Sequence, residues 1–287
     1  MSIARGINLN LMRCRHALVL SSVLGVLALT SCSSQSDNVT QEQLTITGSS
    51  TVAPLMAEIA KKYEQTHPDV RIDVQTGGST RGITDARAGV AQIGMVSRAL
   101  KPDESDLTAH TIALDGISMI IHRDNPIKSL TDQQIKDVYT GKITNWKQVG
   151  GEDKPIQVVN KAEGRSTLEL FTSYFELENS DIQADVVIGD NQQGIKTVAA
   201  NPTAIGYVSI GTAEFEVENN TPIRLLPISG IEASTDNVKN SLFPLSRPLN
   251  LVTKGEVTPA VQELIDFAQA AENKDLTIAQ FFVPVAE

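Results

Sequence analysis

Three times in this chain, an extended apolar stretch is followed by a short Gly/Ser/Thr cluster that opens a helical pattern. The clusters are Gly48-Ser49-Ser50-Thr51, Gly77-Gly78-Ser79-Thr80 and Gly164-Arg165-Ser166-Thr167. Alternating strand, loop and helix predict an α/β fold with doubly wound sheets, in which such loops meet at the carboxyl ends of strands. Backbone N–H groups, hydroxyls and helix dipoles then point to one place, which favours a small oxyanion. Because the clusters fall in both halves of the chain, we expect an anion held between two lobes.

Residues 1–31 are typical of an export signal. They contain three arginines and no acidic residue, followed by an apolar run from Ala17 to Leu29. This run is shorter than the ~20 apolar residues that a membrane-spanning helix needs. We therefore expect a removable signal peptide, with Met12 as an alternative start of the chain.

A cysteine directly follows this signal. The segment Leu29-Thr30-Ser31-Cys32 resembles a bacterial lipobox, which predicts lipid attachment at Cys32. The alternative is an ordinary signal peptide that ends near a cysteine. The next residues are rich in Ser, Gln, Asp, Asn and Thr, so we expect a flexible tether over residues 32–43. The protein should then be exported and anchored to the membrane by lipid, in the periplasm or at the cell surface of a bacterium.

Charge and composition exclude several classes of protein. Loss of the three signal-peptide arginines takes the net charge from −10 to −13, which argues against a nucleic-acid partner. The only other cysteine, Cys14, lies in the signal, so we expect neither a disulfide nor a thiolate metal site. The histidines lack metal-ligand spacing, and the chain has no G-x-S-x-G motif. We expect no metal, no cofactor and no enzymatic activity.

The pattern of apolar residues predicts two lobes with a similar alternation of strands and helices. The first lobe should span residues 44–121, the second 122–244, and residues 245–287 should return to the first. The predicted strands are 44–47, 70–75, 91–96, 111–122, 156–160, 185–188, 204–209 and 243–253. The predicted helices are 52–63, a short helix that follows the Gly77-Gly78-Ser79-Thr80 cluster and ends at Ala88, a helix through Val138 with Thr131 as its N-cap, and 168–175, 194–200 and 259–271.

Asp115 stands out because it interrupts the long apolar run from Thr111 to His122. Burying a carboxylate in such a strand is costly unless a polar group meets it. Asp115 is therefore a candidate site residue. The alternative is a turn-forming Asp-Gly pair at a strand break.

Six ordered motifs resemble the substrate-binding lipoproteins of ABC-type phosphate importers. The motifs are residues 44–55 (LTITGSSTVAPL), 75–83 (QTGGSTRGI), 92–100 (QIGMVSRAL), 141–151 (GKITNWKQVGG), 204–209 (AIGYVS) and 243–254 (FPLSRPLNLVTK). The resemblance covers nearly all of the chain after the signal. It implies a type II periplasmic-binding-protein fold, with two α/β lobes joined by two crossing hinge strands. It also implies that a monomer closes on one inorganic phosphate and delivers it to an ABC permease.

The resemblance further implies which residues contact the anion. In the first lobe they are Ser50, Thr51, Val52 and Ser79, with Ser97 in the loop after the third strand. In the second lobe they are Arg165, Ser166 and Thr167, where many relatives have Ser, Gly and Thr. Arg165 either contacts the anion as a bidentate cation or points to solvent.

Two further departures concern charge. Many relatives have Arg at the position of Lys161, so either Lys161 or Arg165 supplies the cation of the second lobe. Some relatives have Asp where this chain has Ser97-Arg98, and we expect Asp115 to replace it as acceptor for the phosphate proton. Sulfate has no proton to donate, so such an acceptor favours phosphate. We expect Arg98 to be the first-lobe countercharge, with a surface arginine as the alternative, and Arg247 to be a surface group.

Three alternative functions share these features. The first alternative is a phosphate sensor that feeds no permease. The second is a receptor for sulfate, molybdate, arsenate or an organic phosphate, and the third is a phosphoester hydrolase. The hydrolase is the least favoured, because the sequence contains no evident nucleophile with its base.

Overall fold

The computed structural model describes residues 41–285. The expected signal peptide, Cys32 and most of the expected tether lie outside the described residues. The end of the tether was predicted wrongly, because strand β1 (Glu42–Gly48) already begins at Glu42. Glu42 and Gln43 pair with Val70 and Arg71 of strand β2 (Val70–Thr76). Backbone pairing with a neighbouring strand therefore overrides the polar composition of these two residues.

The strands fall into two groups, which we call the first and second strand groups. The first contains β1, β2, β3 (Ile93–Val96), β9 (Ser246–Lys254), β10 (Val283–Pro284) and the first part of β4 (Leu107–His122). The second contains the rest of β4 with β5 (Gln157–Lys161), β6 (Val186–Ile188), β7 (Ala204–Ser209) and β8 (Ile223–Leu226). Their hydrogen-bonded order is β2-β1-β3-β9-β4-β7-β5-β6, and β8 and β10 also pair with β4.

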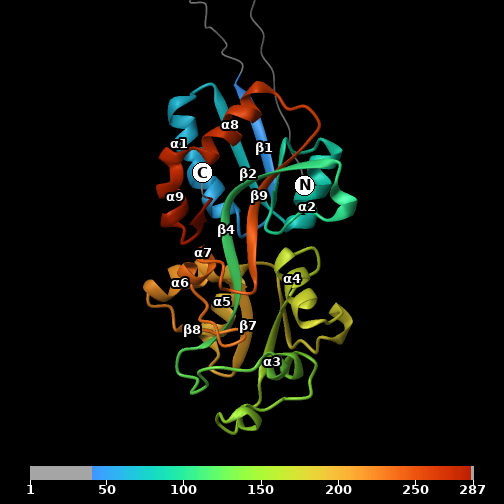
Figure 1. The fold of residues 1–287 in the computed structure, drawn as a ribbon, viewed down its shortest axis with the longest axis vertical. Coiled ribbons are helices and arrows are strands. Elements are labelled where there is room, and N and C mark those ends of the chain that lie inside the picture. Colours follow the sequence, from blue (N-terminus) through green and yellow to red (C-terminus); the bar gives the residue numbers. More distant parts are fainter. Residues whose placement is uncertain (1–40, 286–287) are drawn as a thin grey trace, which may run out of the picture. The chain divides into compact units, whose positions relative to one another are not determined.

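Strands β4 and β9 connect the two groups, and Figure 1 shows them side by side between the blue and yellow parts of the ribbon. Residues 107–116 of β4 pair antiparallel with β9, whereas residues 117–121 pair with β7. Strand β4 continues through Asp115 and Gly116, which pair with Arg247 and Ser246. The alternative of a strand break at Asp-Gly is therefore wrong.

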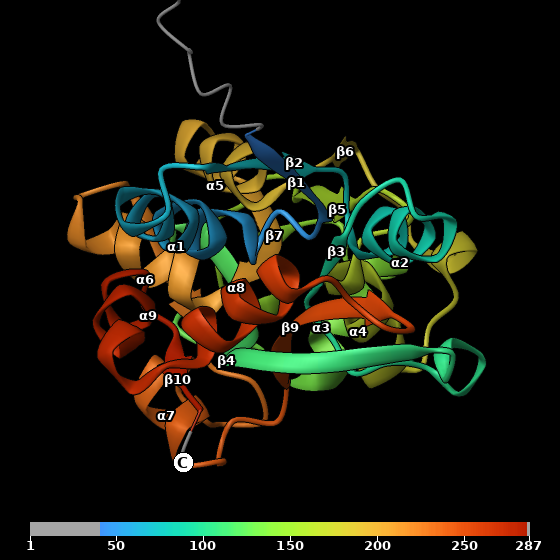
Figure 2. The ribbon, with the colours of Figure 1, turned by 90° about the horizontal axis from the view of Figure 1, so that it is seen from above.

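Helices cover both strand groups. The first group carries α1 (Ala53–Thr66), α2 (Ser79–Ala88), α8 (Pro259–Gln269) and α9 (Lys274–Ala279). The second carries α3 (Asp132–Tyr139), α4 (Ser166–Phe175), α5 (Asn191–Ala200), α6 (Ile210–Glu218) and α7 (Thr235–Lys239). Figure 2 shows α1 and α8 on one side of the first group and α2 on the other, which is the two-faced covering of a doubly wound sheet.

Each group has its own apolar core, which the sequence pattern anticipates. Helix α1 buries Leu55, Met56 and Ile59 against the first group, at the spacing expected of one helix face. Helix α3 begins with a capping box between Thr131 and Gln134 and packs into the core of the second group. The mixed α/β class predicted from sequence is confirmed.

Residues 41–285 contain neither a helix able to span a membrane nor a cluster of metal-ligating side chains. No helix in this range has the length and apolar character needed to cross a membrane. The same range contains no group of three or more His, Cys, Asp or Glu side chains arranged to hold a metal ion.

Candidate functional site

A buried ion pair joins β4 and β9 at the point where they pass between the strand groups. The antiparallel register sets Asp115 opposite Arg247, and each side chain is 1% exposed. Arg247 donates from Nε and Nη2 to Asp115 Oδ2, at 3.1 and 2.8 Å. Asp115 Oδ1 accepts from the backbone N–H of Gly211 at 3.2 Å. Both carboxylate oxygens therefore have hydrogen-bond donors, as a buried charge requires.

Arg247 also reaches hydroxyl groups from both strand groups. Its Nη2 donates to Thr51 Oγ1 at 3.3 Å, beside the start of α1. Its Nη1 donates to Thr167 Oγ1 at 3.1 Å, in the first turn of α4, and lies 3.4 Å from Ser97 Oγ. One guanidinium thus connects two helix starts that belong to different strand groups.

Short hydroxyl side chains organise the first-group part of this region. Ser49 Oγ accepts from the N–H groups of Thr51 and Val52, at 3.2 and 3.4 Å, and donates to Ser97 Oγ at 3.0 Å. Ser79 Oγ, at the first position of α2, accepts from the N–H of Ser97 at 3.1 Å. These bonds connect the starts of α1 and α2 to the end of β3, and the N-terminal ends of the two helices contribute positive potential there.

Asn191 extends the network from the second strand group. It is the first residue of α5, and its Nδ2 donates to Thr51 Oγ1 at 3.1 Å. Its Oδ1 accepts from Lys161 Nζ at 3.0 Å, at the end of β5. Burial lowers the pKa of Lys161 to about 7; nearby Asp190 opposes this shift, whereas Arg247 and Arg165 add to it. A group with this pKa changes its charge readily when an anion approaches.

We call the linked residues the central polar cluster. Its members are Ser49, Thr51, Ser79, Ser97, Asp115, Lys161, Thr167, Asn191 and Arg247.

Ser166 lies beside this cluster with an unsatisfied hydroxyl. It is the first residue of α4 and is 2% exposed, yet its Oγ has no hydrogen-bond partner within residues 41–285. Buried hydroxyls in native proteins are almost always hydrogen-bonded. An unpartnered donor next to Thr167, whose hydroxyl accepts from Arg247, therefore points to an acceptor supplied by a ligand.

The start of α2 and the loop that precedes α4 touch each other. Thr80 N donates to the carbonyl oxygen of Gly164 at 3.2 Å. Gly78 has a φ of +94°, and a Cβ placed there would lie 2.6 Å from that oxygen and 2.9 Å from Arg165 Cδ. Only glycine permits both this backbone conformation and this close approach.

Most of the site residues predicted from sequence come together here. Thr51, Ser79, Ser97, Asp115 and Thr167 are cluster members, and Ser166 is adjacent. Val52 directs its N–H to Ser49, and its side chain is buried in the first core. Ser50 is half-buried and lines a concavity of about 370 Å³ near the starts of α1 and α5. Arg165 is half-buried, and no hydrogen bond from its guanidinium is found within residues 41–285.

Arg98 does not have the expected place. It is buried, which also excludes the surface alternative, and its guanidinium pairs with Glu104 and Glu169 instead of cluster members. The physical reason is local: Glu104 lies in the short turn after β3, close enough to pair with Arg98 through both oxygens.

Two functional candidates were missed. Arg247 was assigned to the surface, although it stands between Pro244 and Pro248 in an apolar crossing segment. The argument applied to Asp115, a charge in a buried strand, would have found it. Asn191 follows a short strand and opens a helix, like the three clusters, but lacks their Gly/Ser/Thr composition.

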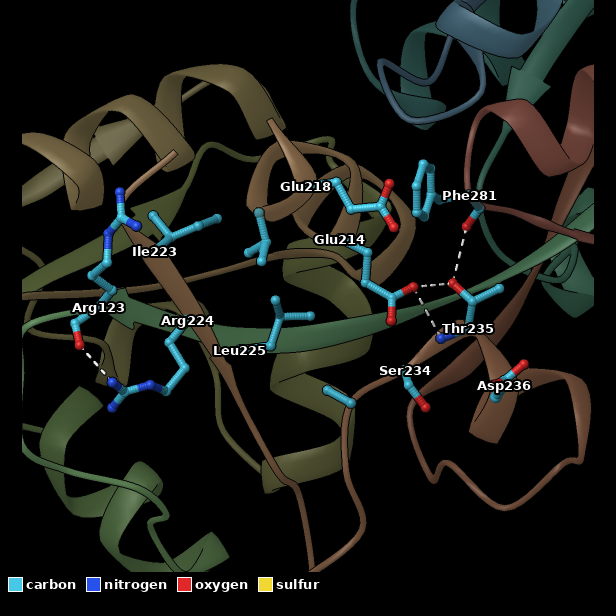
Figure 3. Close-up of a pocket in the computed structure, with 12 residues that line it drawn as sticks. Arg123, Glu214, Glu218, Ile223, Arg224, Leu225, Ser234, Thr235, Asp236 and Phe281 are labelled. Carbon is cyan, nitrogen blue, oxygen red and sulfur yellow. Dashed lines mark hydrogen bonds between the residues drawn. The ribbon is translucent and has the colours of Figure 1, made fainter. Parts of the chain in front are cut away.

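A further concavity of about 660 Å³ shares no residue with the central polar cluster. Figure 3 shows that its lining includes Glu214, Thr235 and Phe281. The Glu214 carboxylate accepts from both the hydroxyl and the N–H of Thr235, whose hydroxyl also contacts the Phe281 carbonyl at 3.2 Å. Burial raises the pKa of Glu214.

Comparisons with known proteins agree with the motifs. The PBP superfamily domain matches residues 33–272. The phosphate-binding protein PstS of Bacillus subtilis is 30% identical over 250 residues, which cover 85% of this chain and 81% of that protein. The PstS of Borreliella burgdorferi is 24% identical over 281 residues, 94% of this chain and 99% of that protein.

Two solved structures share the fold. A Clostridium perfringens chain, assigned as a phosphate ABC transporter substrate-binding protein and solved with bound phosphate, has a TM-score of 0.79 and 35% identity. An ABC-type phosphate transport receptor from Vibrio cholerae has a TM-score of 0.70 and 31% identity. In both comparisons, 85% of this chain and 100% of the other are covered. The mixed α/β fold is thus that of type II periplasmic binding proteins, and the chain belongs to the PBP superfamily and, within it, to the PstS family.

Proposed function

We propose that this protein binds inorganic phosphate in the central polar cluster and delivers it to an ABC permease. The observation that carries the proposal is the position of Arg247, which is buried and reaches the starts of α1 and α4 from a fixed pair with Asp115. A guanidinium held in place by a carboxylate is well suited to an oxyanion, because its geometry is already organised before the ligand arrives. The PstS relatives are binding proteins, and the chain is likewise a binding protein and not an enzyme.

The proposed phosphate ligands come from both strand groups. In the first group they are the hydroxyls of Thr51 and Ser79 and the N–H groups beside them, with Ser50 and Val52. In the second group they are Ser166 and Thr167 at the start of α4, and Lys161 next to Asn191. The buried and unpartnered hydroxyl of Ser166 supports this set. We place Lys161 rather than Arg165 as the second cation, since Lys161 is buried and bonded into the cluster.

We further propose that the strand groups are two lobes that close about β4 and β9 as hinge strands. The change of partner along β4 supports a first crossing near residues 116–117, earlier than the boundary at 121–122 expected from sequence. The second crossing then lies near residues 244–246. The hydrogen bonds from Asn191 to Thr51 and from Thr80 to Gly164 join the two groups and are expected of a closed form.

Selectivity for phosphate over sulfate is proposed to depend on Asp115. Asp115 remains the proposed acceptor of the phosphate proton. Its oxygens already accept from Arg247 and Gly211, so its second role is to hold the guanidinium. Both roles predict that its carboxylate charge affects anion binding.

The remaining parts of the proposal concern location. We propose that residues 1–31 are removed, that Cys32 carries the lipid, and that the protein works as an anchored monomer outside the cytoplasm. Replacing Cys32 with Ser should move the protein from the membrane fraction to the soluble extracytoplasmic fraction. Retention of the variant in the membrane fraction would contradict the lipid anchor.

Titration calorimetry with phosphate and with sulfate tests the binding function. We expect saturable binding of one phosphate per chain and much weaker binding of sulfate. Absence of phosphate binding, or preference for sulfate, would refute the proposal. Measurement of phosphate uptake in cells that lack the gene separates transport from sensing, because a pure sensor leaves uptake unchanged.

A further inference from the structure

Glu169 links the two strand groups outside the central polar cluster. It lies in the first turn of α4, in the second group. Its Oε2 is 2.8 Å from Arg98 Nε and 2.8 Å from Lys101 Nζ, and both cations belong to the first group. Its Oε1 lies 3.5 Å from the hydroxyl of Thr80 in α2. One carboxylate of the second group thus contacts three side chains of the first.

Hydrogen bonds to residues of its own strand group fix the position of Arg98. Glu104 accepts from Arg98 Nη1 and Nη2 at 2.6 and 2.7 Å, and Asn250 Nδ2 donates to the Arg98 carbonyl at 2.8 Å. Arg98 is buried, with a side chain 5% exposed. Its position therefore does not depend on Glu169, and its Nε lies within ion-pair distance of that carboxylate.

The same backbone segments carry both the contact and the site. Ser166 and Glu169 are three residues apart on α4, so they lie on one side of the helix. Ser97 and Arg98 are consecutive, and Ser97 belongs to the central polar cluster. When α4 approaches far enough for Ser166 and Thr167 to reach the cluster, Glu169 reaches Arg98 and Lys101.

We propose that Glu169 is a positioning residue that stabilises the closed form and so slows the release of phosphate. The inference rests on the proposed function, since it takes closure to be the step that holds the anion. Glu169 contacts no cluster member, and it acts by making the closed arrangement of α4 more favourable. A ligand-independent contact of this kind raises affinity by raising the fraction of closed protein.

The contact between Glu169 and Arg98 is expected to stabilise the closed form because both side chains are largely shielded from water. The Glu169 side chain is 24% exposed and Arg98 is 5% exposed, whereas the Lys101 side chain is 48% exposed. Screening should therefore weaken the Lys101 contact more than the Arg98 contact. Opening leaves Arg98 paired with Glu104, so its charge stays compensated while the contact with Glu169 is lost.

The test compares Glu169→Gln with Glu163→Gln. Glu163 is exposed, lies just before α4, and accepts only from Asn179 of its own group among the described residues, so the second variant removes the same charge without touching the interface. Stopped-flow measurement of phosphate dissociation should give a rate roughly 5- to 150-fold faster for Glu169→Gln, the usual range for a coupling between two conformations. Association and the thermal midpoint of the phosphate-free protein should change little.

Hydrogen exchange in phosphate-free protein gives a second, independent readout. The Thr80 amide bonds to Gly164 only when the groups meet, so its exchange should be faster in Glu169→Gln than in Glu163→Gln. Equal dissociation rates and equal Thr80 exchange in the two variants would overturn the inference. If the unmodified protein binds no phosphate but Thr80 exchange still responds to Glu169, the proposed ligand fails and the positioning role of Glu169 stands.

Discussion

Replacing Arg247 with Gln separates the binding role of this residue from its structural role. The substitution removes the charge that compensates Asp115, and both side chains are 1% exposed. Breaking a buried ion pair on one side costs about 3–5 kcal/mol, because the remaining charge stays buried and unpaired. For a domain of this size about 1 kcal/mol moves the thermal midpoint by roughly 2–4 °C, so the midpoint should fall by roughly 6–20 °C.

The effect on phosphate should be at least as large. Arg247 is expected to supply two charge-assisted hydrogen bonds to the anion, each contributing about 1.5–3 kcal/mol. Loss of about 3 kcal/mol corresponds to a roughly 100-fold weaker affinity. In the variant, the unpaired carboxylate of Asp115 also repels the anion, which lowers the affinity further.

The double variant Arg247→Gln with Asp115→Asn resolves the two effects. A neutral pair of similar shape removes the buried charge, so stability should recover most of the loss, while phosphate binding should not recover. Scanning calorimetry and titration calorimetry measure the two quantities, with Arg71→Gln as a control that changes an exposed arginine. The reasoning is refuted if Arg247→Gln binds phosphate within threefold of the unmodified protein, or if the double variant is no more stable than the single one.

Three further predictions test other parts of the site. Lys161 has a pKa of about 7 in the phosphate-free protein, so above that pH it takes up a proton when phosphate binds. The unmodified protein should bind phosphate more tightly than Lys161→Met, and this difference in affinity should shrink by up to about tenfold per pH unit above 7. Titration calorimetry between pH 6 and 9 checks this, and a constant advantage would mean that Lys161 does not titrate. Asp115→Asn should lower the ratio of phosphate to sulfate affinity if Asp115 accepts the phosphate proton, whereas an unchanged ratio would leave it only the role of holding Arg247. Gly78→Ala should weaken phosphate binding by roughly tenfold or more, because its Cβ meets the Gly164 carbonyl in the closed form. Gly89→Ala is the control, because Gly89 also has a positive φ of +68° but no atom lies near its Cβ. This variant introduces backbone strain without a clash and should bind phosphate normally. Equal phosphate affinities of the two variants would contradict the steric argument.

The lowered pKa of Lys161 also makes the stability of the folded state depend on pH. In the phosphate-free folded state its pKa is lowered from 10.5 to about 7, so between these values the unfolded chain binds the proton and the folded chain does not. Stability therefore rises with pH across this window, and the cost of burying the charged lysine is greatest below pH 7. Phosphate reverses part of that cost by providing a countercharge.

Much of the framework followed from local pattern. Helix α2 ends at Ala88 as predicted, strand β7 has the predicted bounds, Thr131 caps α3 as predicted, and the Gly/Ser/Thr clusters do lead into α1, α2 and α4. These features depend on nearest neighbours: glycine at positive φ, hydroxyls beside free N–H groups, and apolar residues at helix or strand spacing. Such preferences act within a few residues, so one sequence is enough to find them.

The partners of the charged side chains were not accessible in this way. Arg98 follows the end of β3 and Arg247 lies at the start of β9, and their sequence surroundings do not say which one enters the site. The register of β4 against β9 determines which arginine enters the site, because it places Asp115 opposite Arg247, 132 residues away in the chain. Arg98 instead pairs with Glu104 in the turn after β3. The sequence by itself therefore determined where N–H groups and hydroxyls gather, because helix starts are local. Only the tertiary structure decided which cation stands among them, because a buried charge takes its position from the partner that long-range strand pairing supplies.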